Sequence, residues 1–217
     1  MPLFTNAEVD GGGRLAVWRI EETPEELKKF IPDETFYSLM QRPVHPRRRI
    51  QKLALEALLR EAQGDIADLI HYSALGKPLL PAGKGFISIA HNPQHVAVIV
   101  HPRLACGIDV ERTDRRALKV SERFMHPEES DWVRESHRAF DATLVWAVKE
   151  CLFKQLGEEN VPFRDGLRVN KPLFMGSRSG TGSALAYRDE RTHYTEYRFT
   201  ELGGDLLAYT FSQPNRS

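Results

Sequence analysis

The order of the strand-like and helical segments constrains the fold of this chain more than any other feature of the sequence. A strand-like run at 14–20 is followed by helical segments and then by two apolar runs, 86–90 and 95–100, joined by a turn at Asn92-Pro93. The same order begins again after Pro102. The strands of this second part are expected at 105–111, 183–187, 194–200 and 206–211, with turns at 188–191 and Gly203-Gly204.

This repeated order predicts an α+β fold. The two similar parts meet near 101–104, so we expect an N-terminal α+β half at 1–103 and a C-terminal α+β half at 104–217. No repeat of the residues themselves accompanies the repeated order, which therefore only suggests a duplicated architecture.

Capping residues and apolar spacing predict where helices occur. A helix is expected to start at Thr23-Pro24-Glu25-Glu26, where Thr23 and Glu26 form a capping box and Pro24 fills the first turn. A longer helix is expected at 46–62, with Leu53, Ala57 and Leu58 on its apolar face. Loops are expected at Gly76-Lys77-Pro78 and at 81–85, where glycine and proline interrupt the pattern.

Composition excludes some classes of protein. Lys plus Arg number 30 and Asp plus Glu also number 30, so the formal net charge is zero, whereas nucleic-acid-binding proteins usually carry a basic excess. Cys106 and Cys151 are too few for a disulfide scaffold, and we expect them to be small core residues in a reducing compartment. We expect a cytoplasmic protein, because we find no signal peptide and no apolar run of about 20 residues.

The first candidate for chemistry is Gly-Ile-Asp-Val-Glu at 107–111. Side chains two residues apart on a strand point to the same face, so Asp109 and Glu111 are expected together while Ile108 and Val110 face the core. Two adjacent carboxylates repel each other, and a hard divalent cation commonly reconciles them. The alternative is an edge strand with a solvated acidic face.

The second candidate is a helix expected at 143–156 and ended by Gly157. Trp146, Glu150 and Lys154 follow one another at intervals of four residues and so share a face. Either Glu150 and Lys154 form a surface ion pair of about 0.3–0.5 kcal/mol, or Glu150 joins Asp109 and Glu111 as a third metal ligand. The opposite, buried stripe is expected to contain Leu144, Val148, Cys151 and Leu152.

Histidines and basic residues are weaker candidates. His91 and His95 have the spacing of a helical zinc pair, but Asn92-Pro93 between them makes a helix unexpected there. His91 at a strand end can still donate to a phosphate, although a loop histidine without a role is commoner. The basic residues Arg47-Arg48-Arg49, Lys52 and Lys77 suit phosphate groups, with a solvated helix end as the alternative.

Taken in order, these segments resemble the 4′-phosphopantetheinyl transferase superfamily, in its monomeric, surfactin-synthetase-activating branch. The resemblance extends from about Arg47 to Gly157. It is carried by Gly76-Lys77-Pro78, by Phe-Ile-Ser-Ile-Ala-His at 86–91, by Gly-Ile-Asp-Val-Glu at 107–111 and by Trp-Ala-Val-Lys-Glu-Cys-Leu-Phe-Lys at 146–154.

The resemblance implies a fold, a reaction and roles for residues. It implies a monomeric pseudo-dimer of two α+β halves that binds coenzyme A in the cleft between them and transfers phosphopantetheine to a serine of an apo acyl or peptidyl carrier protein. Coenzyme A is the co-substrate and Mg²⁺ the cofactor; an all-carboxylate site also suits Mg²⁺ better than Zn²⁺. Asp109, Glu111 and Glu150 would bind the metal. The implied coenzyme A-binding residues are Arg48, Arg49, Lys77, Ser88, His91 and Lys154.

The resemblance leaves the proton acceptor open. Glu150, Glu129 or a metal-bound hydroxide could take the proton of the carrier serine, and Glu129 matches a weaker family position. Asp109 and Lys154 would act in catalysis by stabilising the pyrophosphate and the departing 3′,5′-ADP.

Three positions depart from the usual pattern of the superfamily. Ala90 precedes His91 where serine is frequent, Leu75 precedes Gly76 where an aromatic residue is frequent, and Cys151 replaces a common alanine.

Two other functions are alternatives to the transferase. They are an inactive coenzyme A-binding scaffold or regulator and a Mg²⁺-dependent hydrolase of the coenzyme A pyrophosphate. The intact carboxylates and Lys154 favour an active transferase.

Overall fold

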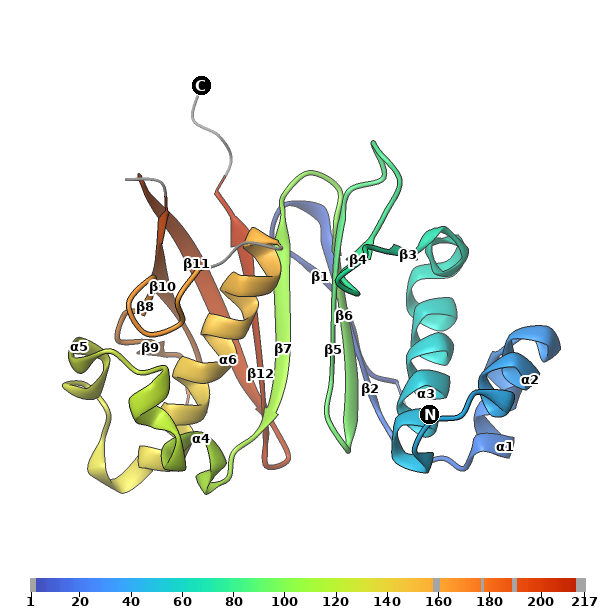
Figure 1. Ribbon diagram of the computed structural model, residues 1–217, viewed down its shortest axis with the longest axis horizontal. Coiled ribbons are helices and arrows are strands. Elements are labelled where there is room, and N and C mark those ends of the chain that lie inside the picture. The colour runs from blue at the N-terminus through green and yellow to red at the C-terminus, as the bar shows by residue number, and fades with distance from the viewer. Residues whose placement is uncertain (1–2, 158–160, 177, 189–190, 214–217) are drawn as a thin grey trace. The chain divides into compact units, whose positions relative to one another are not determined.

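The chain divides into two compact units, Met1–Arg103 and Leu104–Ser217, each of which is described here by itself. The computed structural model describes residues 3–157, 161–176, 178–188 and 191–213. Both units combine helices with antiparallel sheets, which agrees with the predicted α+β class (Figure 1). The pseudo-dimer stays a prediction.

The first unit contains a four-stranded antiparallel sheet in the order β1-β2-β6-β5. Its strands are β1 (Leu3–Val9), β2 (Gly13–Arg19), β5 (Phe86–His91) and β6 (His95–His101). A separate two-stranded ribbon pairs β3 (His71–Tyr72) with β4 (Pro78–Leu79). The predicted strand pair around Asn92-Pro93 is therefore confirmed, whereas β1, β3 and β4 were not predicted.

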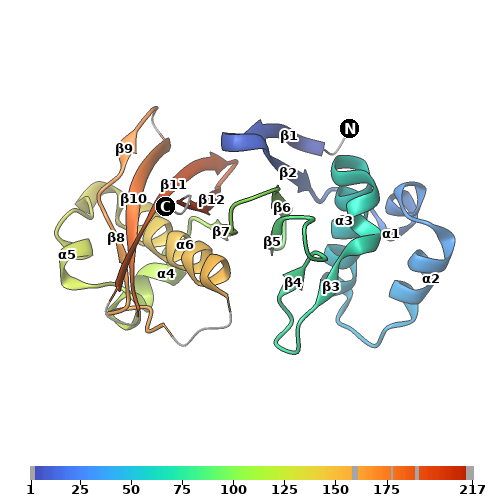
Figure 2. The same ribbon diagram turned by 90° about the horizontal axis from the view of Figure 1, so that it is seen from above.

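The helices of the first unit are α1 (Pro24–Leu27), α2 (Asp33–Gln41) and α3 (Pro46–Gln63). The predicted capping box of Thr23 and Glu26 is present at the start of α1. Helix α3 lies between the sheet and the pair α1–α2 (Figure 2). It buries Leu53, Ala57 and Leu58, as predicted, against Trp18 and the strands β2 and β6.

The second unit contains a larger antiparallel sheet in the order β7-β12-β11-β10-β8, with the short strand β9 paired to β10. Its strands are β7 (Cys106–Arg112), β8 (Leu167–Val169), β9 (Leu173–Phe174), β10 (Ser179–Arg188), β11 (Arg191–Leu202) and β12 (Asp205–Ser212). The predicted turn at Gly203-Gly204 is present, and its positive φ angles of 60° and 96° favour glycine. The turn expected at 188–191 includes 189–190, which lie outside the described residues.

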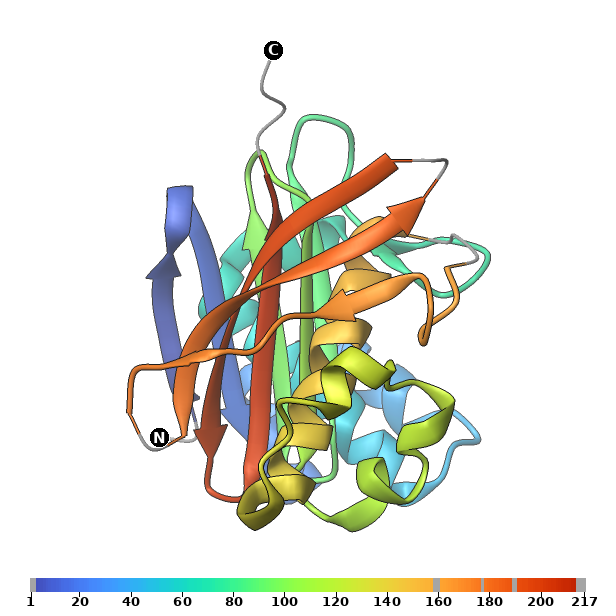
Figure 3. The same cartoon turned by 90° about the vertical axis from the view of Figure 1, so that its left-hand side faces the viewer.

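The helices of the second unit are α4 (Arg115–Lys119), α5 (Pro127–Ser130) and α6 (Arg138–Leu156). Helix α6 runs along one face of the sheet and packs on β7 and β12 (Figure 3). It starts at Arg138 rather than at Thr143, because Asp141 is buried in an ion pair with Arg134 and the first turn is held there. The predicted buried stripe of Leu144, Val148, Cys151 and Leu152 is confirmed.

Gly107 on β7 allows α6 to pack closely on this strand. A Cβ atom at this position would lie 1.9 Å from the carbonyl oxygen of Cys151 on α6, so no larger residue fits without moving the helix. This close approach places Asp109 and Glu111, which lie two and four residues after Gly107 on β7, against α6. Among the described residues, no helix is long and apolar enough to cross a membrane.

Candidate functional site

Asp109 on β7 and Lys154 on α6 are in direct contact. The Lys154 ammonium donates to the Asp109 Oδ1 atom at 2.7 Å and to the backbone carbonyl of Ile108 at 2.9 Å. Asp109 is only 6% exposed, which rules out a solvated acidic face at this position. Burial alone would lower the pKa of Lys154, but the Asp109 carboxylate outweighs it and raises the pKa. Lys154 is therefore a firmly charged cation.

Glu111 and Trp146 form a second contact between β7 and α6. The Trp146 Nε1–H group donates to the Glu111 Oε1 atom at 3.2 Å. Burial and the neighbouring Asp109 carboxylate raise the pKa of Glu111. Trp146 and Lys154, two residues of the predicted face of α6, thus contact the carboxylates of β7. The alternative, a surface ion pair between Glu150 and Lys154, is wrong for Lys154, because its partner is Asp109.

Glu150 lies in the same group of charges. Burial raises the pKa of its carboxyl to about 7, and the negative charges of Asp109 and Glu111 act in the same direction while Lys154 opposes them. Asp109, Glu111 and Glu150 thus influence one another and Lys154 through their charges, and Asp109 is in direct contact with Lys154. Carboxylates that repel each other in a partly buried place are the environment in which a bound cation would stabilise the charged forms.

One oxygen of Asp109 provides a direct test of whether a cation fits. Its Oδ2 atom is buried and has no hydrogen-bond partner. Such an orphaned carboxylate oxygen, beside two further carboxylates, suits a hard, oxygen-binding ion such as Mg²⁺. In the described part of the chain, no three His, Cys, Asp or Glu side chains already form a ready-made metal site. Asp109 Oδ1 is instead held by Lys154.

Glu129 has a structural environment of its own. Its side chain is fully buried and forms an ion pair of 2.9 Å with the equally buried Lys149. Its two oxygens also accept from the backbone N–H groups of His126 and Val169, and Lys149 donates to two backbone carbonyls, those of Phe124 and Phe163. The donors around its two oxygens tie this carboxylate to α6, to the start of α5 and to β8, so its role is structural. Sequence reasoning missed this pair because its members are separated by 20 positions in the chain.

The first unit contains a cavity of about 560 Å³. Of the predicted coenzyme A-binding residues, it brings together Arg48 and His91, beside the turn at Gly76 and Pro78. Its other polar lining residues are Thr35, Ser38, Arg42, Gln51, Lys52, Glu56 and Tyr72. Arg42 and Tyr72 had not been singled out from the sequence, since nothing in the sequence indicates that α2 and the β3–β4 ribbon line the same cavity as α3.

Three other predicted residues do not line this cavity. Ser88 is only 3% exposed. The Arg49 guanidinium donates to the carbonyl oxygen of Arg42, at 3.2 Å. The backbone N–H of Lys77 donates to the Ser73 hydroxyl, which holds the turn before Pro78. Their binding roles stay predictions.

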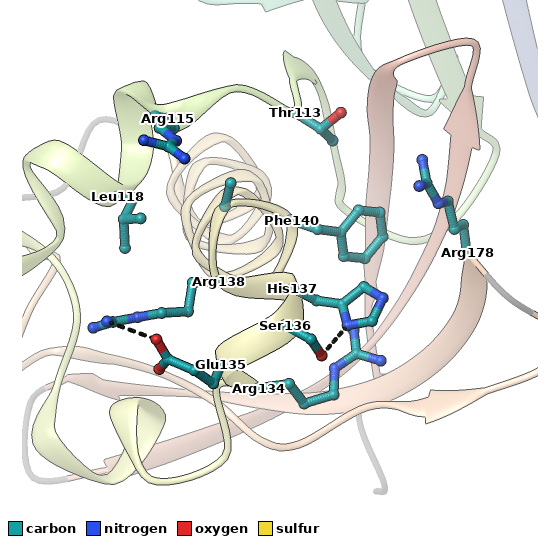
Figure 4. A pocket seen from close by; sticks show the side chains of 11 residues that line it. Thr113, Arg115, Leu118, Arg134, Glu135, Ser136, His137, Arg138, Phe140 and Arg178 are labelled. Atoms are coloured by element: carbon teal, nitrogen blue, oxygen red, sulfur yellow. Dashed lines mark hydrogen bonds and ion pairs between the residues drawn. The ribbon is translucent and has the colours of Figure 1, made fainter.

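A second cavity, of about 430 Å³, lies in the second unit. Figure 4 shows four arginines and His137 around it, together with Phe140 and Leu118. Arg134 is held by Asp141 and Arg178 by Glu201. Arg115 and Arg138 are exposed, and Arg138 pairs with Glu135, which also lines the cavity, at 3.6 Å. Arg115 and Arg138 are the first residues of α4 and α6, whereas Arg134 precedes α6 and Arg178 precedes β10. Sequence analysis did not locate this basic surface, because its residues are far apart in the chain.

A comparison with protein-family models finds a match in the second unit. Residues 105–201 match the family model of the 4′-phosphopantetheinyl transferase superfamily. This segment contains β7 and α6 and therefore all the carboxylates and the lysine described above. The match supports a transferase that acts on phosphopantetheine in general. A search of the curated proteins found no match to the chain.

Proposed function

We propose that this protein transfers the 4′-phosphopantetheine group of coenzyme A to a serine of an apo carrier protein, with Mg²⁺ as cofactor. The observation that carries the proposal is the group of three carboxylates around Lys154 within the segment that matches the superfamily. Its products are the holo carrier protein and 3′,5′-ADP. This activity is that of a holo-[acyl-carrier-protein] synthase, and we expect it in the cytoplasm.

The reaction requires charge stabilisation and one proton transfer. The carrier serine oxygen forms a bond to the phosphorus that bears pantetheine, and the bond from this phosphorus to the bridging oxygen of the pyrophosphate breaks. Asp109, Glu111 and Glu150 would hold Mg²⁺, which when bound neutralises pyrophosphate charge. Lys154 supplies a fixed positive charge for the phosphate oxygens, because the Asp109 carboxylate keeps it protonated.

Glu150 is the better proton acceptor of the two glutamates. Glu150 belongs to the group of carboxylates that would hold Mg²⁺ near the reacting phosphate, where a proton acceptor is needed. Glu129 is fully buried and already accepts from Lys149 and two backbone N–H groups. We therefore assign proton transfer to Glu150 and a structural role to Glu129.

We further propose that the carrier protein docks on the basic cavity of the second unit. The lining arginines favour an acidic surface, and carrier proteins of this reaction class tend to be acidic. Arg138 and Glu150 are 12 positions apart on α6, which corresponds to about 18 Å along the helix axis. An acidic helix of the carrier could bridge this distance while its serine approaches the carboxylates.

Charge reversal tests the docking surface. The double variant Arg115→Glu and Arg138→Glu should raise the KM for the carrier protein, while the KM for coenzyme A stays unchanged. Lys171→Glu, an exposed position of the same unit away from the cavity, is the matched control. A carrier KM equal to that of the control variant would exclude this surface.

The transfer itself is tested by measuring the intact mass of an apo acyl carrier protein after incubation with the protein, coenzyme A and Mg²⁺. We expect a gain of one phosphopantetheine group that disappears when EDTA is added. Hydrolysis of coenzyme A without any carrier would instead indicate the pyrophosphate hydrolase. Binding of coenzyme A without transfer to several classes of carrier would indicate the inactive scaffold.

A further inference from the structure

Trp146 on α6 holds the Glu111 carboxylate with a neutral donor. Its Nε1–H group donates to the Glu111 Oε1 atom at 3.2 Å, across the contact between α6 and β7. An indole N–H group is a donor only and carries no charge, so it orients a carboxylate without neutralising it. The contact therefore fixes how Glu111 points and leaves its negative charge for a ligand.

The two carboxylates of β7 are held in different ways. Lys154 holds the Asp109 Oδ1 atom in an ion pair of 2.7 Å, which places a positive charge directly on that carboxylate. Trp146 and Lys154 are eight positions apart on α6, about 12 Å along the helix axis. Glu150 lies midway between them in the chain. Each carboxylate of β7 thus has one oxygen bound by a donor from α6, and the donor to Glu111 is the neutral one.

Two phenylalanine rings hold the indole of Trp146 in place. The Phe124 ring meets it edge to face, with the ring centroids 5.1 Å apart. The Phe163 ring lies against it with a centroid separation of 5.5 Å and an angle of 35° between the planes. Aromatic pairs at these separations are stabilising beyond the area that they bury. Both phenylalanines come from segments outside α6, so the indole is held by more than its own helix.

One buried side chain anchors the backbones of these two phenylalanines. The Lys149 ammonium donates to the carbonyl oxygens of Phe124 and Phe163, at 2.7 Å each. Lys149 follows Trp146 on α6 by three positions, and the equally buried Glu129 balances its charge. A buried ion pair is costly unless further hydrogen bonds satisfy its remaining donors. Here those bonds fix the two segments whose rings contact the indole.

We propose that Trp146 is a positioning residue, which fixes Glu111 for the binding of a divalent cation. This inference rests on the proposed function, because Glu111 is then a ligand of Mg²⁺. Without the N–H group the carboxylate has more freedom to turn, and ordering it when the cation binds costs conformational entropy. A lysine or arginine in place of the indole would also hold Glu111, but its positive charge would repel the cation.

Measurements of metal binding test this role apart from turnover. Calorimetric titration with Mg²⁺, in the presence of coenzyme A and without a carrier protein, gives the Kd of the metal. Trp146→Phe keeps an aromatic ring and removes the N–H group. We expect its Kd for Mg²⁺ to rise by about 10- to 100-fold, the usual loss when the hydrogen-bond partner of a metal ligand is removed. In the transfer assay, excess Mg²⁺ should restore most of the rate, which a general structural defect would not allow.

Trp132→Phe is the matched control. Trp132 is a half-buried tryptophan of the same unit, and its Nε1–H group donates to the backbone carbonyl of Val169 at 3.3 Å. This variant also loses an indole hydrogen bond, but it should bind Mg²⁺ as the wild type does.

The outcomes separate this inference from the proposed function. If Trp146→Phe binds Mg²⁺ as tightly as Trp132→Phe, the inference is overturned while the proposed function stands. A transfer rate of Trp146→Phe that excess Mg²⁺ does not restore would also overturn it. Wild-type protein that binds no Mg²⁺ in the presence of coenzyme A would overturn both the inference and the proposed role of the metal. A thermal melt verifies that each variant is folded.

Discussion

The charges of Asp109, Glu111 and Glu150 repel one another, and this repulsion determines what a single substitution does. Glu150→Gln keeps the size of the side chain and removes one negative charge. Transfer should fall by about 100-fold or more, the usual range for a lost acid–base group. The metal-free variant should melt at the same or a higher temperature than the wild type, because burial and repulsion disfavour the ionised carboxyl. Transfer rates and thermal melts test this together, and near-normal turnover would contradict the role of Glu150.

His101 on β6 provides a prediction about pH. Its ring is fully buried, and burial lowers its pKa below the usual 6.5, with Arg103 acting in the same direction and the backbone of Asp10 against it. When the pKa of a histidine is lower in the folded protein than in the unfolded chain, its neutral form favours folding at pH values above the pKa of the unfolded chain. This contribution is lost as the pH falls through the pKa of the folded protein. The melting temperature should therefore fall as the pH is lowered below about 6.5.

His101→Gln serves as the comparison, because glutamine does not titrate. Its melting temperature should depend less on pH between 7.5 and 5.5 than that of the wild type. Its absolute stability is not the readout, since the hydrogen bonds of the ring to Asp10 and Arg103 are also changed. Parallel pH profiles for the two proteins would contradict the prediction.

The packing of α6 on β7 depends on Gly107. Gly107→Ala would place a methyl group 1.9 Å from the Cys151 carbonyl oxygen, so the helix must move. We expect a loss of stability of at least about 1–3 kcal/mol, as for other overpacked sites. The same movement should disturb the contact of Lys154 with Asp109 and reduce transfer. Denaturant unfolding measures the stability. A loss below about 0.5 kcal/mol, which is the size typical of surface substitutions, would contradict this view.

The buried Lys149–Glu129 pair connects α6 to α5 and β8. Lys149→Met leaves the Glu129 carboxylate buried without its cation, which should cost about 3–5 kcal/mol. Lys149→Met combined with Glu129→Gln should recover part of this loss, because no uncompensated charge remains. Denaturant unfolding of the two variants tests the coupling. Equal losses in the single and double variants would indicate that the pair does not act as a unit.

Sequence patterns predicted those elements whose signals are local. Alternation on β7 indicated that Asp109 and Glu111 share a face, and spacing by four residues indicated that Trp146 and Lys154 do. The sequence could not indicate which partners meet, because Lys154 to Asp109 and Lys149 to Glu129 are tertiary contacts between distant segments. Short strands such as β8 and β9 were missed because two or three residues carry no periodicity. Helix α2 was missed because its nine residues bury only Phe36 and Leu39, which is too short an apolar pattern to indicate a helix.

The whole chain should respond to its two ligands in a linked way. A ligand at about 100 times its Kd stabilises a protein by about 2.7 kcal/mol, or about 5–10 °C for a chain of this size. Coenzyme A with Mg²⁺ should therefore raise the melting temperature of the wild type by several degrees, and EDTA should reduce this increase.

Asp109→Ala should lose the Mg²⁺-dependent part of the increase in melting temperature, because it removes a proposed metal ligand. Lys171→Glu should retain both effects, and an increase in the wild type that is identical with and without EDTA would contradict metal-assisted binding.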